Sequence, residues 1–160
     1  MKTVRFGTFE TNSSSCHSLT ISDELSDKLM DIRKKLEAHG TGEYGWSGTV
    51  RYPEEKLDYY LVDLSYLYHD DKDGFEKKLE EIKNYFMSKG TELDITPAYS
   101  NSKWQLLEGY IDHESIGTVN YMTLDELYDW VFTNGTGVHL LNDNSYYGDE
   151  ELPSLKYNEA

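Results

Sequence analysis

Two stretches of the sequence repeat apolar residues at intervals of three and four, and these repeats constrain the fold more than any other feature. The first stretch begins at Pro53, and the second runs from Gly74 to Lys89, just before Gly90. Residues at this spacing share one face of an α-helix, so each stretch predicts a helix with one buried side. The predicted buried residues are Leu57, Tyr60, Leu61, Leu64 and Tyr68 in the first helix, and Phe75, Leu79, Ile82 and Phe86 in the second.

Two shorter signals predict further helices. Ser22 can cap a helix that ends at Gly40. Thr123 and Glu126 have the spacing of a capping box, in which each side chain accepts a hydrogen bond from the other residue's backbone N–H, so a short helix should begin after Thr123. In the helix capped by Ser22, the apolar positions are Leu25, Leu29, Ile32 and Leu36.

Segments with a two-residue alternation, which is typical of β-strands, lie around these helices. Asn134 and Gly135 form a turn signal ahead of the last of them. We therefore expect a single α+β domain over residues 1–160, with a small mixed or antiparallel sheet packed against three to four helices. From about residue 142 onward we expect an acidic, partly irregular tail. The predicted strands cover residues 2–9, 17–21, 91–97, 106–112 and 137–142.

The net charge is extreme for a small domain. Thirty Asp and Glu residues against 15 Lys and Arg residues give a charge of −15 at pH 7. From Trp104 onward, eleven acidic residues are accompanied by one basic residue, Lys156. Such a surface repels the phosphate backbone of nucleic acids and attracts proteins with basic clefts, so we expect no direct nucleic-acid binding. The alternative is that the charge only keeps a tyrosine-rich chain soluble.

Carboxylates three or four residues apart on a helix form short rows of negative charge, with about 5–6 Å between neighbours. Such rows approximate the spacing of phosphates, and a basic cleft could accept them. The candidate binding carboxylates are Glu54 and Asp58 in the first helix, Asp125, Glu126 and Asp129 in the last helix, and Asp149, Glu150 and Glu151 in the tail.

A dense polar cluster, TNSSSCHS, occupies residues 11–18 and contains the only cysteine of the chain. Cys16 and His17 suggest a nucleophile and its base, but neighbours in a strand point to opposite faces, so Cys16 is better explained as a small core residue. We expect a turn between two strands here. Its hydroxyls could make local turn hydrogen bonds or, with His17, line a pocket. The hydroxyl candidates are Ser13, Ser14 and Ser15, and the loop lacks the Gly-Lys-Ser/Thr ending of a P-loop.

A second polar cluster contains Asp112 and His113, within the stretch IDHES. A pocket shared with the serine loop should bring Asp112 or His113 within hydrogen-bonding or water-bridged reach of that loop. His17, His113 and Asp143 would make a two-histidine, one-carboxylate metal set, although structural histidines are the simpler explanation. We therefore expect no cofactor.

Residues 69–80 partly resemble a calcium-binding loop. Asp71, Asp73 and Glu80 occupy positions that bind the ion, but His69 stands at the first ligand position. Capping of the helix that follows by Asp73 explains the stretch without a metal.

The cysteine count and the hydropathy indicate a compartment. A single cysteine excludes an internal disulfide framework and a zinc site built from several cysteines. The start MKTVRFGTFE lacks the apolar core of a signal peptide, and no apolar run is long enough to span a membrane. We expect a cytoplasmic protein with no membrane partner.

The opening FGTFETNSSSCHSLTI resembles the start of a family of uncharacterised bacterial and bacteriophage proteins that carry a Phe-Glu-Thr-Asn-Ser-Ser-Ser…His-Ser signature. The stretches IDHES and LLNDN are similar to polar segments of the same family. The resemblance implies a phage or mobile-element origin and carries no activity with it. It favours a pocket built from Asn12, Ser13, Ser14, Ser15, His17, Asp112 and His113.

Two function classes remain. The first is a small acidic phage or mobile-element protein that blocks a basic nucleic-acid-binding surface of a host protein, such as a defence nuclease, by mimicking nucleic acid. The second is an enzyme that acts on a nucleotide or phosphoester, with the serine loop and the two histidines at its centre. The shortage of Lys and Arg to hold phosphates counts against the enzyme.

Overall fold

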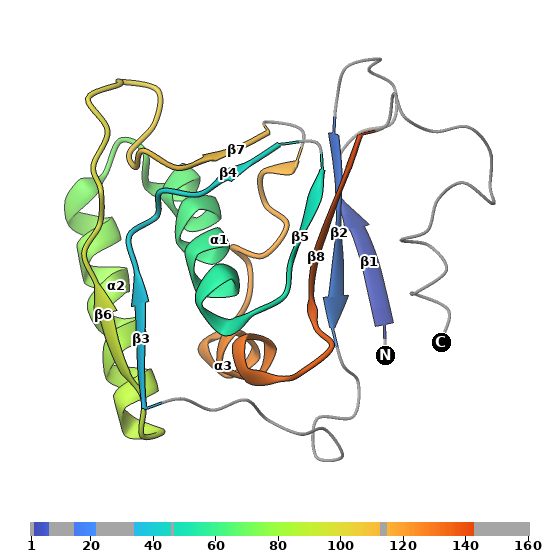
Figure 1. Cartoon of the computed structure of the whole chain (residues 1–160). Helices are drawn as coiled ribbons and strands as arrows, with labels where there is room; N and C mark the ends of the chain where they lie inside the picture. Colours follow the sequence, from blue (N-terminus) through green and yellow to red (C-terminus); the bar gives the residue numbers. More distant parts are fainter. Residues whose placement is uncertain (1, 7–14, 22–33, 46, 113–114, 143–160) are drawn as a thin grey trace.

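The structure is a computed structural model that describes residues 2–6, 15–21, 34–45, 47–112 and 115–142 (Figure 1). Its strands are β1 (Lys2–Phe6), β2 (Ser15–Ile21), β3 (Lys35–Ala38), β4 (Glu43–Tyr44), β5 (Gly48–Val50), β6 (Glu92–Ile95), β7 (Tyr110–Ile111) and β8 (Gly137–Asn142). Its helices are α1 (Pro53–Ser65), the short 3₁₀ helix η2 (Tyr66–Tyr68), α2 (Lys72–Ser88) and α3 (Leu124–Phe132).

Four strands form an antiparallel sheet in the order β1-β2-β8-β5. Leu19 of β2 pairs with Val138 of β8, which pairs in turn with Val50 of β5. All three side chains are buried and belong to the hydrophobic core. This row therefore joins β2, β8 and β5 to the hydrophobic core.

The other four strands form two parallel pairs, β3 with β6 and β4 with β7. Backbone hydrogen bonds from Ala98 N to His39 O (2.9 Å) and from Gly109 N to Gly40 O (2.8 Å) connect the two pairs. The two pairs thus form one long ribbon. Between β6 and β7 the chain makes a loop, and an isolated β-bridge joins Tyr99 and Leu107 at its base. A glycine is required at position 109, where the two pairs connect, because a Cβ there would lie 2.5 Å from Gly40 O.

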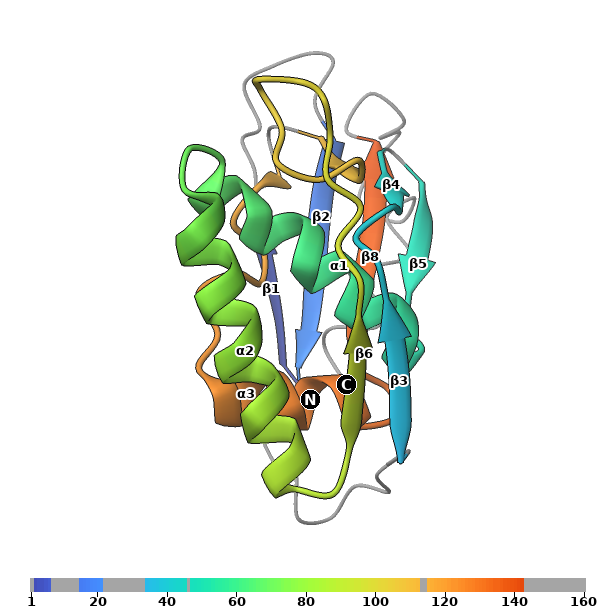
Figure 2. The same ribbon diagram turned by 90° about the vertical axis from the view of Figure 1, so that its left-hand side faces the viewer.

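Helix α1 lies between the ribbon and the four-stranded sheet, with α2 beside β6 and α3 across the lower end of the molecule (Figures 1 and 2). Ten of the 13 residues of α1 are buried, whereas α2 buries four of its 17 residues. Helix α1 is therefore the central element of the fold, and α2 is a surface helix with one apolar face.

The α+β class predicted from the sequence is confirmed, as are the helices after Pro53, before Gly90 and after Thr123. Every predicted apolar position of α2 is buried. In the first helix, all but Tyr68 are buried, and Tyr68 lies half-buried in η2. Spacing of three and four thus identified all the buried residues of α2, but only some of those of α1.

The predicted helix from Ser22 to Gly40 is wrong at its C-terminal end. Leu36 lies in strand β3, where Leu36 and Ala38 are buried and Lys35 and Glu37 are exposed. This two-residue alternation is that of a strand paired with β6, and it outweighs the weaker helical spacing. Residues 22–33 lie outside the described residues.

The predicted cap of α2 is also corrected. Asp71, and not Asp73, caps this helix, because its Oδ1 accepts a hydrogen bond from Gly74 N at 2.9 Å. Asp73 lies in the first turn, where a negative charge favours the helix dipole. The capping box of Thr123 and Glu126 is present as predicted.

Candidate functional site

His17 is the one residue of the serine-loop cluster whose side chain the structure describes, and it is buried in the core. It lies in β2 and is 0 % exposed. Its Nε2 lies 2.9 Å from Gly45 O, and its Nδ1 lies 2.6 Å from the Tyr59 hydroxyl of α1. A carbonyl only accepts, so Nε2 carries the proton and Nδ1 accepts the Tyr59 hydroxyl proton.

Burial lowers the pKa of His17 from 6.5 to about 4, because the charged imidazolium would lose its hydration. The Gly45 carbonyl and the negative charge of Asp112 act in the opposite direction and are outweighed. His17 is therefore neutral at pH 7 and holds two parts of the core together. A substrate or metal has no free ring nitrogen to contact in this arrangement.

The hydrogen-bonded network continues from Tyr59 to the loop after β7. The Thr118 hydroxyl contacts Tyr59 and donates to Ser115 O at 2.6 Å. Asp112, at the start of this loop, is buried, and its charge acts on His17. Asp112 therefore acts on His17 through its charge, while the ring nitrogens of His17 contact Tyr59 and Gly45.

The remaining residues of the predicted pocket and metal set are only partly placed. Ser15 is the first residue of β2 and pairs with Asn142 of β8. Within the described ranges, no group of three or more His, Cys, Asp or Glu residues is arranged to hold a metal ion. Asn12, Ser13, Ser14, His113, Asp143 and the tail carboxylates Asp149, Glu150 and Glu151 lie outside the described residues.

Sequence reasoning missed two buried charged residues on α1. The Lys56 ammonium donates to the carbonyls of Trp130 (2.9 Å) and Thr133 (3.0 Å) and to the Thr136 hydroxyl (2.7 Å). It thereby satisfies carbonyls at the C-terminal end of α3, where the helix dipole favours a positive charge. Lys56 is 1 % exposed.

Asp63 is the second such residue and is 0 % exposed. Its carboxylate accepts hydrogen bonds from the backbone N–H groups of Gly117 (2.7 Å), Val119 (2.8 Å) and Asn120 (3.0 Å). Burial raises the pKa of Asp63 to about 6, although these three donors act to lower it. Lys56, Tyr60 and Asp63 are spaced by four and three residues, and this second helical stripe was the available signal.

The two candidate binding carboxylates on α1 lie in different surroundings. Glu54 is exposed. The carboxylate of Asp58 is occupied inside the molecule, because it accepts from three successive backbone N–H groups of residues 40–42 and from the Tyr44 hydroxyl. Asp58 therefore fixes the link between β3 and β4.

The candidate carboxylates on α3 lie at the surface. Asp125 and Glu126 are exposed, and Asp129 is half-buried one turn further along. The Tyr85 hydroxyl of α2 donates to Asp125. Burial raises the pKa of Asp129, as does the charge of Asp125 to a smaller degree. We refer to Asp125, Glu126 and Asp129 as the α3 carboxylate row.

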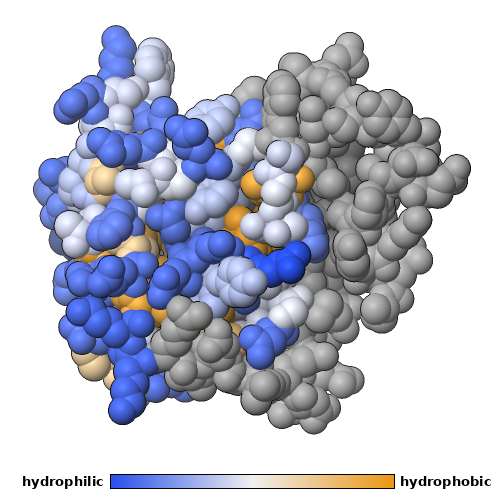
Figure 3. Space-filling model, viewed as in Figure 1, coloured by the Kyte–Doolittle hydropathy of each residue, from blue (hydrophilic) through white to orange (hydrophobic). Residues whose placement is uncertain are grey.

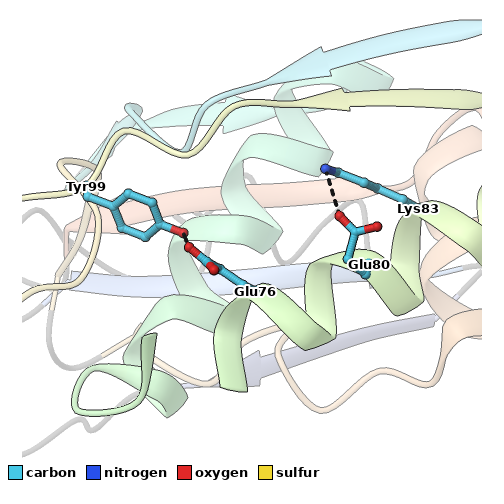
Figure 4. Close-up of polar contacts among 4 residues, drawn as sticks. All are labelled: Glu76, Glu80, Lys83 and Tyr99. Atoms are coloured by element: carbon cyan, nitrogen blue, oxygen red, sulfur yellow. Dashed lines mark hydrogen bonds and ion pairs between the residues drawn. The ribbon is translucent and has the colours of Figure 1, made fainter. Parts of the chain in front are cut away.

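An open groove of about 650 Å³ runs along α2 beside the segment that follows β6. Figure 4 shows Tyr99 pointing toward Glu76 and Lys83 pointing toward Glu80, and both pairs are in contact, at 2.9 Å and 3.3 Å. The groove combines both signs of charge along its length. Its lining consists of Asp73, Glu76, Lys77, Leu79, Glu80, Lys83, Pro97 and Tyr99.

Most of the coloured surface on the face seen in Figure 3 is hydrophilic, with small apolar areas between polar residues. Over the residues that the structure describes, no helix combines the length and the apolar character needed to span a membrane. Comparison with protein-family models, with curated proteins and with solved structures found no match for this chain. The resemblance to a bacterial and bacteriophage family therefore stays a prediction.

Proposed function

We propose that this protein binds a basic, nucleic-acid-binding surface of another protein and blocks it, with surface carboxylates standing in for phosphates. The observation that carries the proposal is the uneven charge: residues 104–142 contain six Asp and Glu residues and neither Lys nor Arg. The expected setting is the cytoplasm of a host cell, with a phage or mobile-element protein acting on a host defence protein.

The α3 carboxylate row provides the surface for this contact. Its helix is held by the Thr123–Glu126 capping box and by the packing of Tyr128 and Phe132 against Phe86 of α2. The carboxylates therefore lie on a rigid element, which lowers the entropy cost of binding. Tyr121, which is 52 % exposed beside this helix, adds the kind of aromatic contact that is common at interfaces.

The surface of α2 carries lysines as well as acidic residues. Helix α2 pairs Lys78 with Glu81 and Lys83 with Glu80. Positive and negative charges therefore compensate one another locally on α2, whereas no lysine or arginine lies in α3. A basic partner should prefer the α3 side.

The test uses two triple reversals with the same change of net charge. Asp125, Glu126 and Asp129 are changed to lysine in one variant, and Asp73, Glu80 and Glu81 of α2 are changed to lysine in the matched control. Proteins captured from a host lysate are purified, and their binding to fluorescent DNA is measured by anisotropy with each variant as competitor. We expect the wild type and the α2 variant to displace the DNA and the α3 variant to lose at least about tenfold in potency.

Equal loss in both variants would mean that only net charge matters, and no displacement by the wild type would refute the proposed function. Thermal unfolding of both variants provides the control for folding, because Glu126 also closes the capping box of α3.

A further inference from the structure

Four hydrogen-bond donors converge on the carboxylate of Asp58. Gly40 N lies 2.8 Å and Thr41 N 3.2 Å from Oδ1, while Gly42 N lies 3.0 Å and the Tyr44 hydroxyl 2.6 Å from Oδ2. An ionised carboxylate has about four acceptor positions, so this set of donors satisfies it completely. We refer to Gly40, Thr41, Gly42 and the Tyr44 hydroxyl as the donor cradle.

The backbone of the cradle is built for close approach to an anion. Gly40 has a φ of +72°, in the left-handed region that favours glycine. A Cβ at Gly42 would collide with the Tyr44 hydroxyl and would lie 2.6 Å from Oδ2 of Asp58, so a side chain at this position would disturb the contact between the two groups. Successive backbone N–H groups that point to one place form the type of concavity that binds anions in many proteins.

The anion in this cradle belongs to a different element of the fold. Asp58 is on α1, 14 to 18 residues away from the donors, and it is half-buried, so one side of the contact is open to solvent. Another negative charge lies close by, since Glu55, like Asp58, raises the pKa of the Tyr44 hydroxyl, after burial as the largest cause. A singly charged anion is therefore favoured over a dianion.

We propose that the donor cradle is a binding site for a small carboxylate and that Asp58 is its built-in occupant. In the wild-type chain Asp58 excludes outside carboxylates, as an autoinhibitory contact does. The site opens when Asp58 is removed or displaced, and displacement adds one free carboxylate to the surface of α1. This inference does not rest on the proposed function.

The test uses the full chain with Asp58→Ala, which empties the cradle and leaves its four donors in place. Thermal unfolding is measured in sodium acetate, sodium phosphate and sodium chloride at equal ionic strength. Acetate should raise the Tm of this variant by about 3 °C at roughly tenfold its dissociation constant. Phosphate should have a smaller effect, and chloride should have none beyond that on the wild type.

Two matched variants isolate the cradle. Asp58→Asn keeps it filled with a neutral group, and Glu54→Ala removes a carboxylate one turn earlier on the same helix and leaves the cradle occupied. Neither should gain a response to acetate. An equal response to acetate in Glu54→Ala, or an equal response of Asp58→Ala to chloride, would show general charge screening and overturn the proposal.

If Asp58→Ala does not fold in chloride, its refolding yield in acetate provides the readout. Recovery of the folded state in acetate, with none in chloride, supports the proposal. Failure to refold in both salts overturns it, as does a folded variant whose Tm ignores acetate.

Discussion

Helices α1 and α2 are neighbours of similar length that use their polar residues in opposite ways. Helix α1 is buried on nearly all sides, and its Lys56 and Asp63 are paired with backbone groups of α3 and of the loop after β7. Helix α2 buries a single apolar stripe and turns its charged residues to solvent, where they pair with each other. Lysine and acidic residues therefore stabilise the fold on α1, whereas on α2 they can be replaced with little loss of stability.

This contrast has a physical basis in solvation. A buried charge or hydroxyl must find partners inside the protein, because water is not there to replace them. An exposed ion pair gains little, since water and salt screen it. The buried residues of α1 should consequently tolerate substitution poorly, and the difference between the helices can be measured.

The largest expected effect is that of Lys56→Ala. Removal of the ammonium takes one donor from the carbonyls of Trp130 and Thr133 and from the Thr136 hydroxyl and creates a cavity, so the free energy of unfolding should fall by about 4 kcal/mol. Urea denaturation measures this change. Lys56→Met, which keeps most of the volume, separates the two causes, and a loss smaller than about 1 kcal/mol in both variants would contradict the account.

Asp63→Ala should have the next largest effect. Three backbone N–H groups of residues 117–120 lose their acceptor, and we expect a destabilisation of about 3 kcal/mol at pH 7. Hydrogen exchange should locate the change, with faster exchange at Gly117, Val119 and Asn120 than at the amides of α2. Unchanged exchange at these three amides would mean that Asp63 does not anchor the loop.

The pH dependence of stability should reveal His17 and Asp63 as opposing groups. The pKa of His17 is lowered to about 4, so the unfolded chain binds the proton first, and stability is lost as the pH falls from about 6.5 to 4. The pKa of Asp63 is raised to about 6, so the folded chain binds the proton first, and stability is gained as the pH falls from about 6 to 4.

Each contribution amounts to about 2 kcal/mol between pH 6 and pH 4, and the two nearly cancel in the wild type. As the pH falls from 6 to 4, the free energy of unfolding of Asp63→Asn should therefore drop by about 2 kcal/mol more than that of the wild type. That of His17→Gln should drop by about 2 kcal/mol less. Comparison with the wild type removes the contributions of the other carboxylates. Parallel curves for all three proteins, measured by urea denaturation at a series of pH values, would show that neither group is perturbed.

The smallest effect is expected on α2. Lys77 is exposed in the open groove, and Lys77→Ala should change the free energy of unfolding by less than about 0.5 kcal/mol. The same urea titration provides the measurement. A loss comparable to that of Lys56→Ala would remove the distinction between the two helices.

The sequence predicts α2 and α3 well because each has local signals that agree with its environment. Phe75, Leu79, Ile82 and Phe86 follow one helical stripe, and the capping box marks the first turn of α3. Local spacing misleads at Leu36, where pairing with a distant strand decides the structure. Propensity and spacing describe neighbours in sequence, and tertiary pairing can override them.

The candidate site was only partly predictable for the same reason. Acidic composition and helical spacing identify the α3 carboxylate row. They cannot show that Asp125 is exposed while Asp58 is hydrogen-bonded inside the molecule, because the partners of Asp58 lie 14 to 18 residues away in the sequence. His17 was singled out for its chemistry, yet its role follows from contacts with Gly45 and Tyr59, which no local pattern encodes. Buried polar networks depend on the finished fold.

The salt dependence of partner binding tests the central claim most directly, namely that surface carboxylates carry the interaction. With a captured basic partner, the dissociation constant should rise at least about tenfold between about 0.1 M and about 0.5 M NaCl, because exposed charges are screened over less than about 10 Å in this range. The unfolding midpoint of the protein alone should change little over the same range. A dissociation constant that stays constant across the titration would contradict the account.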